Sequence, residues 1–324
     1  MDFLEQLRRP VAAELDNYRL LFEQTLTHED DYLGRALDYV RSRKGKMMRP
    51  LMVLLIAKEC GPIRPETLRA AVTLELLHTA SLVHDDVVDE SNMRRGMAST
   101  NAVYGNQIAV LVGDYILSQA LYQAALTNSI EGVRIVAELG ATLSEGEVYQ
   151  LANIRNEKAD EEAYFHIIHR KTAALFAACG ELAARTAGAD DAMVKAAKDF
   201  GRDLGICFQI RDDIFDYFDD ASIGKPTGND MAEGKLTLPA LHVLKSSNDP
   251  ALHATAARIK SGEATTEDIR YMVEAAKSGG GIAYAEQKMA EYRARAEQSL
   301  TAFTNAEVRE SLQAFLAYVV DRNY

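Results

Sequence analysis

Apolar residues recur every three or four positions along most of the chain, a spacing that places them on one face of an α-helix. Proline, which interrupts helices, does not occur between Pro65 and Pro226. The pattern predicts helices over 66–90, 106–127, 131–153, 161–187 and 190–218, with short polar breaks between them. Alternation typical of β-strands is scarce. We therefore predict an all-α protein, a single domain over residues 1–324 built as a bundle of about a dozen helices.

Two polar segments interrupt this helical pattern. Residues 219–234, DDASIGKPTGNDMAEG, are rich in Gly, Asp, Asn and Pro, and a loop of this length is unusual in a compact helical protein. We expect this loop to act as a lid over a site. The second segment, residues 41–46, is strongly basic and is followed by Arg49-Pro50.

The composition excludes several classes of protein. A net charge of −12 argues against a nucleic-acid-binding protein, which usually has a basic surface. The N-terminus has no apolar signal-peptide core, and no run reaches the ~18 to 20 apolar residues of a membrane span, so we expect a cytoplasmic protein. Cys60, Cys179 and Cys207 are odd in number and far apart, so we expect free thiols.

The clearest chemical signal is a D-D-x-x-D motif that occurs twice, as DDVVD at 85–89 and DDIFD at 212–216. On a helix, the first and last aspartates of each motif lie one turn apart on one face, and their repulsion calls for a cation. Carboxylates without His or Cys are the ligands that suit Mg²⁺. Two solvated helix faces are the alternative, which Phe208 upstream of the second motif and Phe215 inside it disfavour. The predicted metal ligands are Asp85, Asp86, Asp89, Asp212, Asp213 and Asp216.

These motifs are accompanied by others, and the set resembles the trans-type isoprenyl (polyprenyl) diphosphate synthases. In chain order the segments are GKMMRP (45–50), HTASLVHDDVVDESNMRRG (78–96), GNQIAVLVGD (105–114), RKTAAL (170–175), FQIRDDIFD (208–216) and GKPTGNDMAEGKLTLP (224–239). The resemblance implies the isoprenoid synthase fold, whose helices surround a central elongated cavity, and a homodimer. One departure is Met47, which stands where the family's basic motif commonly has arginine.

The resemblance also implies a reaction and roles for side chains. Isopentenyl diphosphate would add to the cation formed when an allylic diphosphate, such as farnesyl or geranyl diphosphate, ionises with the help of about three Mg²⁺ ions per active site. Isopentenyl diphosphate would be bound by Lys46, Arg49, His78 and Arg95, and the allylic diphosphate by Arg94, Lys171 and Lys235, with Lys225 closing over both. Thr172 and Gln209 would face the cation, although ordinary hydrogen bonding between helices is an alternative for both.

Small residues before the first aspartate motif bear on product length. In this family a bulky aromatic residue at the fourth or fifth position before the first aspartate closes the hydrocarbon tunnel and gives short products. Here those positions are Ser81 and Ala80, and Leu77 lies about one turn further down the helix. We therefore predict a long-chain product, hexaprenyl to octaprenyl in type, for quinone side chains and for delivery to a membrane.

Three alternatives stay open. A farnesyl or geranylgeranyl diphosphate synthase would use the same chemistry and give a shorter product. A class I terpene cyclase would need an Asn/Asp-Asp-x-x-Ser/Thr-x-x-x-Glu second motif, which DDIFD does not match. A non-catalytic partner subunit of a heteromeric synthase would have a degraded aspartate motif, whereas both motifs are intact.

Overall fold

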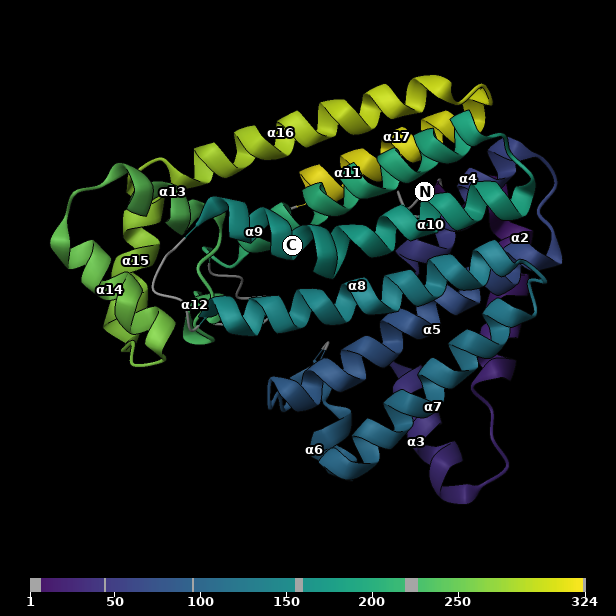
Figure 1. Ribbon diagram of the computed structural model, residues 1–324, viewed down its shortest axis with the longest axis horizontal. Coiled ribbons are helices and arrows are strands. Elements are labelled where there is room, and N and C mark those ends of the chain that lie inside the picture. Colours follow the sequence, from purple (N-terminus) through teal and green to yellow (C-terminus); the bar gives the residue numbers. More distant parts are fainter. Residues whose placement is uncertain (1–6, 44, 95, 155–159, 219–226, 323–324) are drawn as a thin grey trace. The chain divides into compact units, whose positions relative to one another are not determined.

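The computed structural model describes residues 7–43, 45–94, 96–154, 160–218 and 227–322. These residues are almost entirely helical, which confirms the predicted all-α class (Figure 1). In chain order the helices are η1 (Arg9–Val11), α2 (Ala12–Thr25), α3 (Asp31–Ser42), α4 (Met48–Cys60), α5 (Pro65–Val88), α6 (Thr100–Tyr104), α7 (Asn106–Ala125), α8 (Ile130–Ile154), α9 (Glu161–Ile168), η2 (His169–Ala173), α10 (Ala174–Ala187), α11 (Asp191–Phe215), α12 (Asn229–Ala232), α13 (Leu238–Ser246), α14 (Pro250–Ser261), α15 (Thr266–Ser278), α16 (Gly281–Ser299), η3 (Leu300–Ala302) and α17 (Ala306–Asp321).

Four of the five long helices were predicted to within a few residues of their ends, namely α5, α7, α8 and α11. The fifth prediction, 161–187, was wrong in one respect, because the π-helical turn η2 separates α9 from α10. Such turns hold one extra residue and often occur at functional sites. The segment 219–234, which was predicted to be a loop, contains the short helix α12. Residues 219–226 lie outside the described ranges, so the expectation that this segment acts as a lid stays a prediction.

A short hairpin follows the first aspartate motif. Strands β1 (Met93–Arg94) and β2 (Met97–Ala98) pair antiparallel, with Met93 opposite Ala98 and Arg94 opposite Met97. Gly96 has a φ of 75°, which a turn of this kind requires and glycine adopts without strain. Arg94 therefore stands on a strand rather than on an extension of α5, and Arg95 lies outside the described residues.

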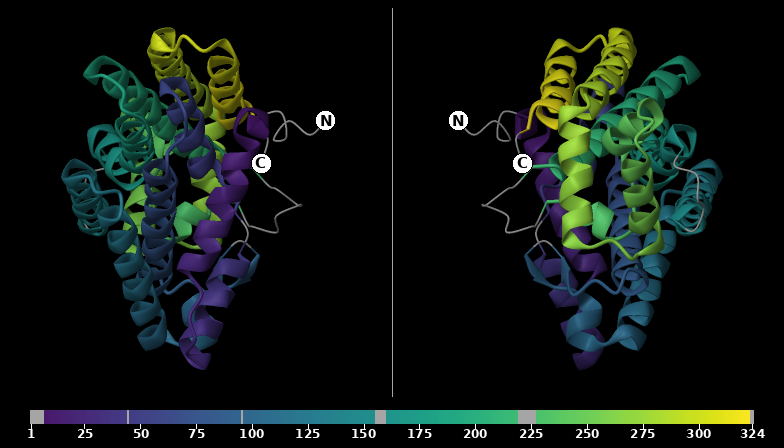
Figure 2. Two further views of the ribbon diagram at one scale, coloured as in Figure 1. Left: turned by 90° about the vertical axis from the view of Figure 1, so that its right-hand side faces the viewer. Right: turned by 90° about the vertical axis from the view of Figure 1, so that its left-hand side faces the viewer.

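The chain divides into two compact units. The first comprises Met1–Gly140, Leu175–Asp199 and Ser299–Ala314. Helix α5 is its centre and packs against α2, α4 and α7, and Figure 2 shows α5 and α7 (blue) running next to each other. Leu74, Leu77, Ala80 and Val83 are buried, and their burial stabilises α5.

The second unit comprises Ala141–Ala174, Phe200–Gln298 and Phe315–Tyr324. Part of its core lies where α12, α13, α14 and α15 meet at the end of α11, and Figure 1 shows α14 and α15 side by side. The buried residues of this core are Tyr217, Met231, Ala240, Val243, Leu244, Leu252, Ala256, Ile259, Met272, Val273 and Ala276. The prediction of one domain over residues 1–324 stays a prediction.

Helix α7 differs from the other described helices in its hydrophobicity. It is long and apolar enough to cross a membrane by length and composition, and the same is true of core helices in many soluble proteins. Several of its large apolar side chains are exposed, with Leu111 at 62% and Tyr122 at 59%. An apolar helical face of this kind usually has a partner.

Candidate active site

The first aspartate motif lies at the C-terminal end of α5. The backbone N–H of Asp89 donates to the carbonyl of Asp85 at 2.8 Å, so the helical geometry continues to the last aspartate. Asp85 is half-buried, Asp89 is exposed, and Asp86 is fully buried. Successive residues of a helix are about 100° apart, so Asp86 can be buried where the neighbouring Asp85 is only half-buried.

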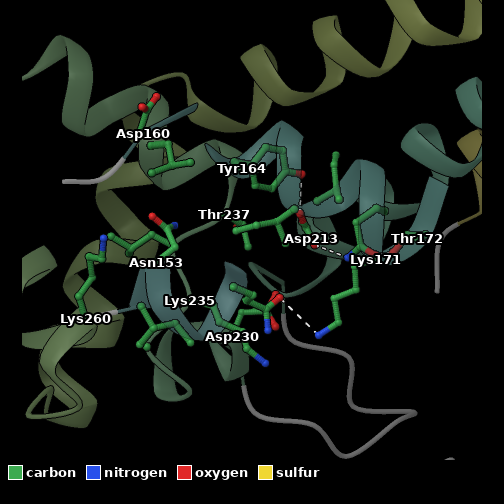
Figure 3. Close-up of a pocket in the computed structure, with 18 residues that line it drawn as sticks. Asn153, Asp160, Tyr164, Lys171, Thr172, Asp213, Asp230, Lys235, Thr237 and Lys260 are labelled. Atoms are coloured by element: carbon green, nitrogen blue, oxygen red, sulfur yellow. Dashed lines mark hydrogen bonds between the residues drawn. The ribbon is translucent and has the colours of Figure 1, made fainter. Parts of the chain in front are cut away.

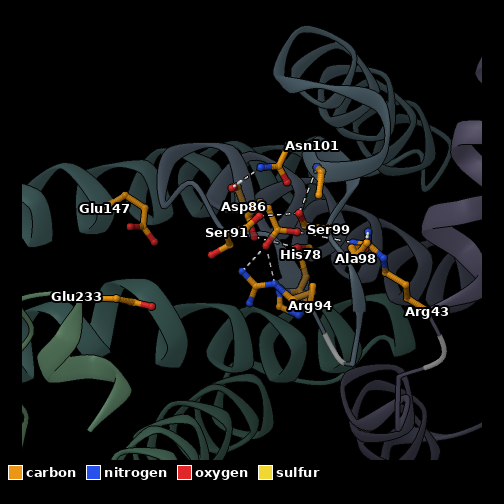
Figure 4. A network of polar contacts seen from close by, with 12 residues as sticks. Arg43, His78, Asp86, Ser91, Arg94, Ala98, Ser99, Asn101, Glu147 and Glu233 are labelled. Carbon is orange, nitrogen blue, oxygen red and sulfur yellow. Dashed lines mark hydrogen bonds and ion pairs between the residues drawn. The ribbon is translucent and has the colours of Figure 1, made fainter. Parts of the chain in front are cut away.

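Asp86 is held by protein side chains, as Figure 4 shows. The Arg94 guanidinium donates to Asp86 Oδ1 from Nε at 2.7 Å and from Nη2 at 2.6 Å. Arg43 Nη1 lies 3.7 Å from Asp86 Oδ2, and Asn101 Nδ2 donates to the Asp86 carbonyl at 3.1 Å. Asp86 therefore neutralises two arginines inside the first unit, and its complete burial distinguishes it from Asp85 and Asp89.

The predicted isopentenyl diphosphate ligands lie around the start of α4 and on α5. Lys46 is exposed, His78 is half-buried, and the Arg49 guanidinium lies 5.0 Å from the centre of the Phe176 ring. Met47, the departure from the family pattern, precedes α4 with a φ of 53°, a left-handed conformation that is uncommon for methionine.

A cavity of about 390 Å³ opens between α2, α3 and α5 in the first unit. Thr79, Leu82 and Val83 of α5 line it, together with Arg43 and Arg94, while Ala80 and Ser81 do not. The Ser81 hydroxyl donates to the His78 carbonyl at 2.9 Å, so its polar atom is satisfied within its own helix. The predicted chain-length residues Ala80, Ser81 and Leu77 thus lie on a different side of α5 from this cavity.

In the second motif, Asp213 is the buried aspartate, with 4% of its surface exposed. Tyr164 Oη donates to Asp213 Oδ2 at 2.5 Å, and Gln209 Nε2 donates to Asp213 Oδ1 at 2.8 Å. Thr172 Oγ1 in turn donates to Gln209 Oε1 at 2.6 Å. The two predicted cation-facing residues, Thr172 and Gln209, are therefore in direct contact.

The two outer aspartates of the second motif have other partners. Arg322 Nη2 donates to Asp212 Oδ1, so the last described residue of the chain reaches the first aspartate of the motif. Asp216 accepts the backbone N–H of Asn229 at 2.9 Å and that of Asp230 at 3.1 Å, one with each carboxylate oxygen. Asp216 thereby fixes the start of α12.

Burial has the largest effect on the ionisation of the Tyr164–Asp213 pair. Removal from water raises the pKa of Asp213 well above its ordinary value, and the charge of Asp230 raises it further. The hydrogen bonds from Tyr164 and Gln209 act in the opposite direction. Burial, followed by the nearby Asp213, also raises the pKa of Tyr164, so Tyr164 stays a protonated donor.

Figure 3 shows the cavity of about 180 Å³ that these residues line in the second unit. Lys171 and Thr172 reach it from η2, and Lys235 from the segment after α12. Lys171 Nζ lies 2.6 Å from Glu147 Oε1, and Lys235 Nζ lies 2.6 Å from Glu233 Oε2. The cavity therefore combines three cationic side chains, those of Lys171, Lys235 and Lys260, with the hydroxyl of Thr172 and the amide of Gln209. Lys225 lies outside the described residues.

The donor set suits a hard divalent cation. Within the described ranges, no three His, Cys, Asp or Glu side chains converge closely enough to hold a metal ion by themselves. Asp85, Asp89 and Asp212 nevertheless present carboxylates that are not fully buried, and a cation such as Mg²⁺ commonly takes few protein ligands and completes its shell with water and substrate phosphate. The residues therefore fit Mg²⁺.

The sequence pattern does not indicate several residues that contact the aspartate motifs. Tyr164, Arg43 and Asn101 each contact a middle aspartate through a hydrogen bond or ion pair. Arg322 contacts Asp212 although the two are 110 residues apart in the chain. These contacts depend on the tertiary fold, so motif spacing could not predict them.

Comparisons with known proteins show the family of the chain. The family model for polyprenyl synthetase matches residues 30–276. An octaprenyl diphosphate synthase of Haemophilus influenzae is 38% identical over 100% of this chain and 98% of its own length. A geranylgeranyl pyrophosphate synthase structure from Bacteroides thetaiotaomicron is 44% identical, with a TM-score of 0.88 over 99% of this chain and 100% of that one.

A third protein is similar in structure. A polyprenyl synthase from Caulobacter crescentus, solved in complex with calcium and isoprenyl diphosphate, has a TM-score of 0.92 and 32% identity, covering 99% of this chain and 98% of that one. The predicted fold and the predicted class of enzyme, a prenyltransferase, are confirmed. The chain belongs to the polyprenyl synthetase family.

Proposed function

We propose that the chain adds isopentenyl diphosphate units to an allylic diphosphate and releases a long-chain all-trans polyprenyl diphosphate, for use as a quinone side chain. Membership of the polyprenyl synthetase family supports the reaction, and the octaprenyl name of the Haemophilus influenzae relative supports the long product. The Bacteroides thetaiotaomicron structure, titled as a geranylgeranyl pyrophosphate synthase, favours the shorter-product alternative.

The observation that carries the long-chain proposal is the small size of the side chains before the first motif. Ala80 and Ser81 stand on α5 about one turn before Asp85, and His78 and Leu77 are the next bulky residues towards the start of the helix. A helical turn of about 5.4 Å is similar in length to an extended isoprene unit. A growing hydrocarbon chain that passes Ala80 and Ser81 would therefore gain room for further units.

We propose that Mg²⁺ is held by the outer aspartates Asp85, Asp89, Asp212 and Asp216. When bound, the metal would neutralise the charge that develops on the departing diphosphate. The middle aspartates, Asp86 and Asp213, are buried, whereas the outer four are not, so the middle pair would instead hold neighbouring side chains. This divides the six predicted ligands into two groups with different roles.

Fixed cations would bind the diphosphates. The allylic diphosphate would contact Arg94, Lys171 and Lys235. Isopentenyl diphosphate would contact Lys46, Arg49, His78 and Arg95, and Lys225 would help to close the site over both diphosphates. Arginine is suited to bidentate phosphate contacts, whereas lysine acts as a point charge. The glutamate partners of Lys171 and Lys235 would release these lysines to the more highly charged diphosphate.

Thr172 and Gln209 would stabilise the allylic cation through their oxygen atoms. The cavity beside them contains the apolar side chains Ile167 and Ile168, which limit the access of water that would otherwise capture the cation. The double bond of isopentenyl diphosphate then attacks the cation. Loss of a proton, accepted by the released diphosphate, completes one addition.

The exposed apolar side chains of α7 support a homodimer. Val110, Leu111, Leu121 and Tyr122 are large and exposed, and residues eleven positions apart lie close to one face of a helix. A second copy of this chain would bury them. Light scattering that gives the mass of a monomer would overturn this part of the proposal, and Leu111→Glu is expected to convert a dimer to monomers.

The experiment that tests the function is incubation with Mg²⁺, isopentenyl diphosphate and farnesyl diphosphate, followed by sizing of the products. We expect products of hexaprenyl to octaprenyl length. An end point at geranylgeranyl diphosphate would contradict the long-chain proposal and leave the prenyltransferase assignment in place. Absence of any elongation would contradict the proposed activity itself.

A further inference from the structure

A line of hydrogen bonds connects Tyr164 to Thr172 through the second aspartate motif (Figure 3). Tyr164 Oη donates to Asp213 Oδ2, Gln209 Nε2 donates to Asp213 Oδ1, and Thr172 Oγ1 donates to Gln209 Oε1, at 2.5, 2.8 and 2.6 Å. The participants come from α9, α11 and η2, so the line joins three elements of the second unit. All four side chains line the same cavity.

The direction of these bonds determines which atoms face the cavity. Asp213 Oδ1 accepts the amide N–H of Gln209 at 2.8 Å, so the amide nitrogen of Gln209 lies on the Asp213 side. The Gln209 carbonyl is then directed towards Thr172, whose hydroxyl proton it accepts. The Thr172 oxygen consequently keeps its lone pairs for another partner, and an electron-rich oxygen is what an allylic cation requires.

Asp213 can impose this order only if it is itself held in one orientation. With 4% of its surface exposed, it has little access to water and needs protein donors on both oxygens. Tyr164 supplies the second donor from a buried position, and its ring packs edge-on against Phe165 at 5.3 Å between centres. Tyr164 thus fixes Asp213 from the side opposite Gln209.

We propose that Tyr164 is a positioning residue for allylic ionisation, acting through Asp213 on the orientation of Gln209 and Thr172. The inference rests on the proposed function. Tyr164 does not itself need to touch substrate, because its effect passes along the hydrogen bonds. Loss of its hydroxyl leaves Asp213 free to rotate towards another donor, and Gln209 then loses its fixed partner.

The test compares Tyr164→Phe with Tyr284→Phe in single-turnover elongation of farnesyl diphosphate by isopentenyl diphosphate and Mg²⁺. Tyr284 is a matched control because its hydroxyl also donates to a carboxylate of the second unit, Glu161 Oε1 at 2.6 Å, away from the motif. Both variants are expected to lose some thermal stability. Only Tyr164→Phe is expected to lower the single-turnover rate, by about tenfold to a hundredfold, with the Kd for farnesyl diphosphate unchanged.

A double-mutant comparison identifies the route of the effect. In a Gln209→Ala background, adding Tyr164→Phe is expected to change the single-turnover rate by less than about twofold, because the residue through which Tyr164 acts is gone. Independent, multiplying effects would overturn the proposal, as would a Tyr164→Phe rate equal to that of the original chain. If the original chain forms no product, the proposed function fails first and this inference fails with it.

Discussion

Arg322 and Asp212 form an ion pair that joins the end of the described chain to the second aspartate motif. The Arg322 guanidinium also lies 4.3 Å from the centre of the Phe208 ring, and Arg211 donates to the Arg322 carbonyl from Nε at 2.9 Å and from Nη2 at 2.6 Å. Only 12% of the Arg322 side chain is exposed, whereas Asp212 keeps 42%. A fixed cation is thus in contact with a carboxylate that we propose as a Mg²⁺ ligand.

This pair predicts that Arg322→Gln will lower the Mg²⁺ concentration needed for half-maximal activity. The guanidinium opposes a second cation at Asp212, so its removal is expected to reduce that concentration by about threefold. Activity measured across a Mg²⁺ titration checks this. Arg270→Gln is the control, since Arg270 pairs with Glu267 on the surface and is expected to leave the titration unchanged.

An unchanged or higher Mg²⁺ requirement in Arg322→Gln would contradict the competition between the two cations. A higher requirement would indicate that Arg322 supports the metal site, for example by orienting Asp212. Competition between the cations predicts a lower Mg²⁺ requirement in the variant and support of the metal site predicts a higher one, so the direction of the shift distinguishes the two roles. Loss of maximal activity without a shift would place the role of Arg322 outside metal binding.

The two adjacent aspartates of the first motif are expected to respond differently to neutralisation. Asp86→Asn removes a fully buried carboxylate from the half-buried Arg94 and from Arg43, which is expected to cost about 3 kcal/mol of unfolding free energy. Asp85→Asn relieves repulsion with Asp89, and Asp85 is only half-buried, so this variant is expected to lose less stability than Asp86→Asn. Urea unfolding without Mg²⁺ measures both, and equal effects would refute the division of roles within the motif.

The sequence allowed the helices and the outer aspartates to be predicted because both depend on local spacing. Apolar periodicity identified α5, α7, α8 and α11, and the i, i+4 rule identified which aspartates share a face. Helical spacing alone does not show that Asp86 is buried, and nothing in the sequence pattern shows that Arg94 on β1 would contact it. Pairing between separate elements is a tertiary property.

Backbone irregularity was the other property that the sequence concealed. Residues 161–187 have continuous helical periodicity, so the π-helical turn at η2 left no gap that the pattern could reveal. This turn carries Lys171 and Thr172, and an extra residue in a turn changes the direction of each side chain that follows. The contact between Thr172 and Gln209 therefore required the structure.

Product length is expected to depend on Ser81. Ser81→Phe places an aromatic ring about one turn before Asp85 and is expected to shorten the product by several isoprene units, with the rate of the first condensation within about threefold of the original. Leu82→Phe is the matched control, because Leu82 lines the 390 Å³ cavity on the other side of α5, which has room for a larger side chain. Product sizing that shows equal shortening in both variants would argue against a tunnel at Ser81.

The segment that leads into α12 is expected to tolerate no side chain at Gly228. Gly228 has a φ of 79°, and a Cβ atom there would lie 2.4 Å from Ile269 Cγ2. Gly262 has a similar φ of 74° with open space around it. Both alanine variants carry a backbone strain of about 1 kcal/mol, and only Gly228→Ala adds a steric clash with Ile269. Gly228→Ala is therefore expected to lose more stability than Gly262→Ala.

The same comparison tests whether α12 supports the second motif. Asp216 accepts the Asn229 and Asp230 N–H groups, so displacement of Gly228 would disturb that carboxylate. We expect Gly228→Ala to lower prenyltransferase activity as well as the thermal midpoint, and Gly262→Ala to affect only the midpoint. Full activity in Gly228→Ala would show that the Asp216 contacts are not needed for catalysis.

The three free cysteines are expected to differ in reactivity and to weaken the fold at alkaline pH. Burial raises the pKa of Cys179 and of Cys207 from 9.0 to about 12, and that of the half-buried Cys60 to about 11. Because the thiolate is the reactive form, iodoacetamide at pH 8.5 should modify Cys60 before the other two, and all three equally in denaturant. Mass spectrometry of the labelled peptides measures this order.

The same pKa values fix the sign of the pH effect on stability. The folded pKa of each thiol lies above its unfolded value, so the folded state holds protons that the unfolded state releases. This contribution is complete below pH 9 and is lost as the pH rises from 9 towards 11 or 12. Urea midpoints should therefore fall from pH 8.5 to 9.5, and the fall should be smaller in Cys179→Ala. A slope that does not change in that variant would show that the Cys179 thiol has the same pKa in both states.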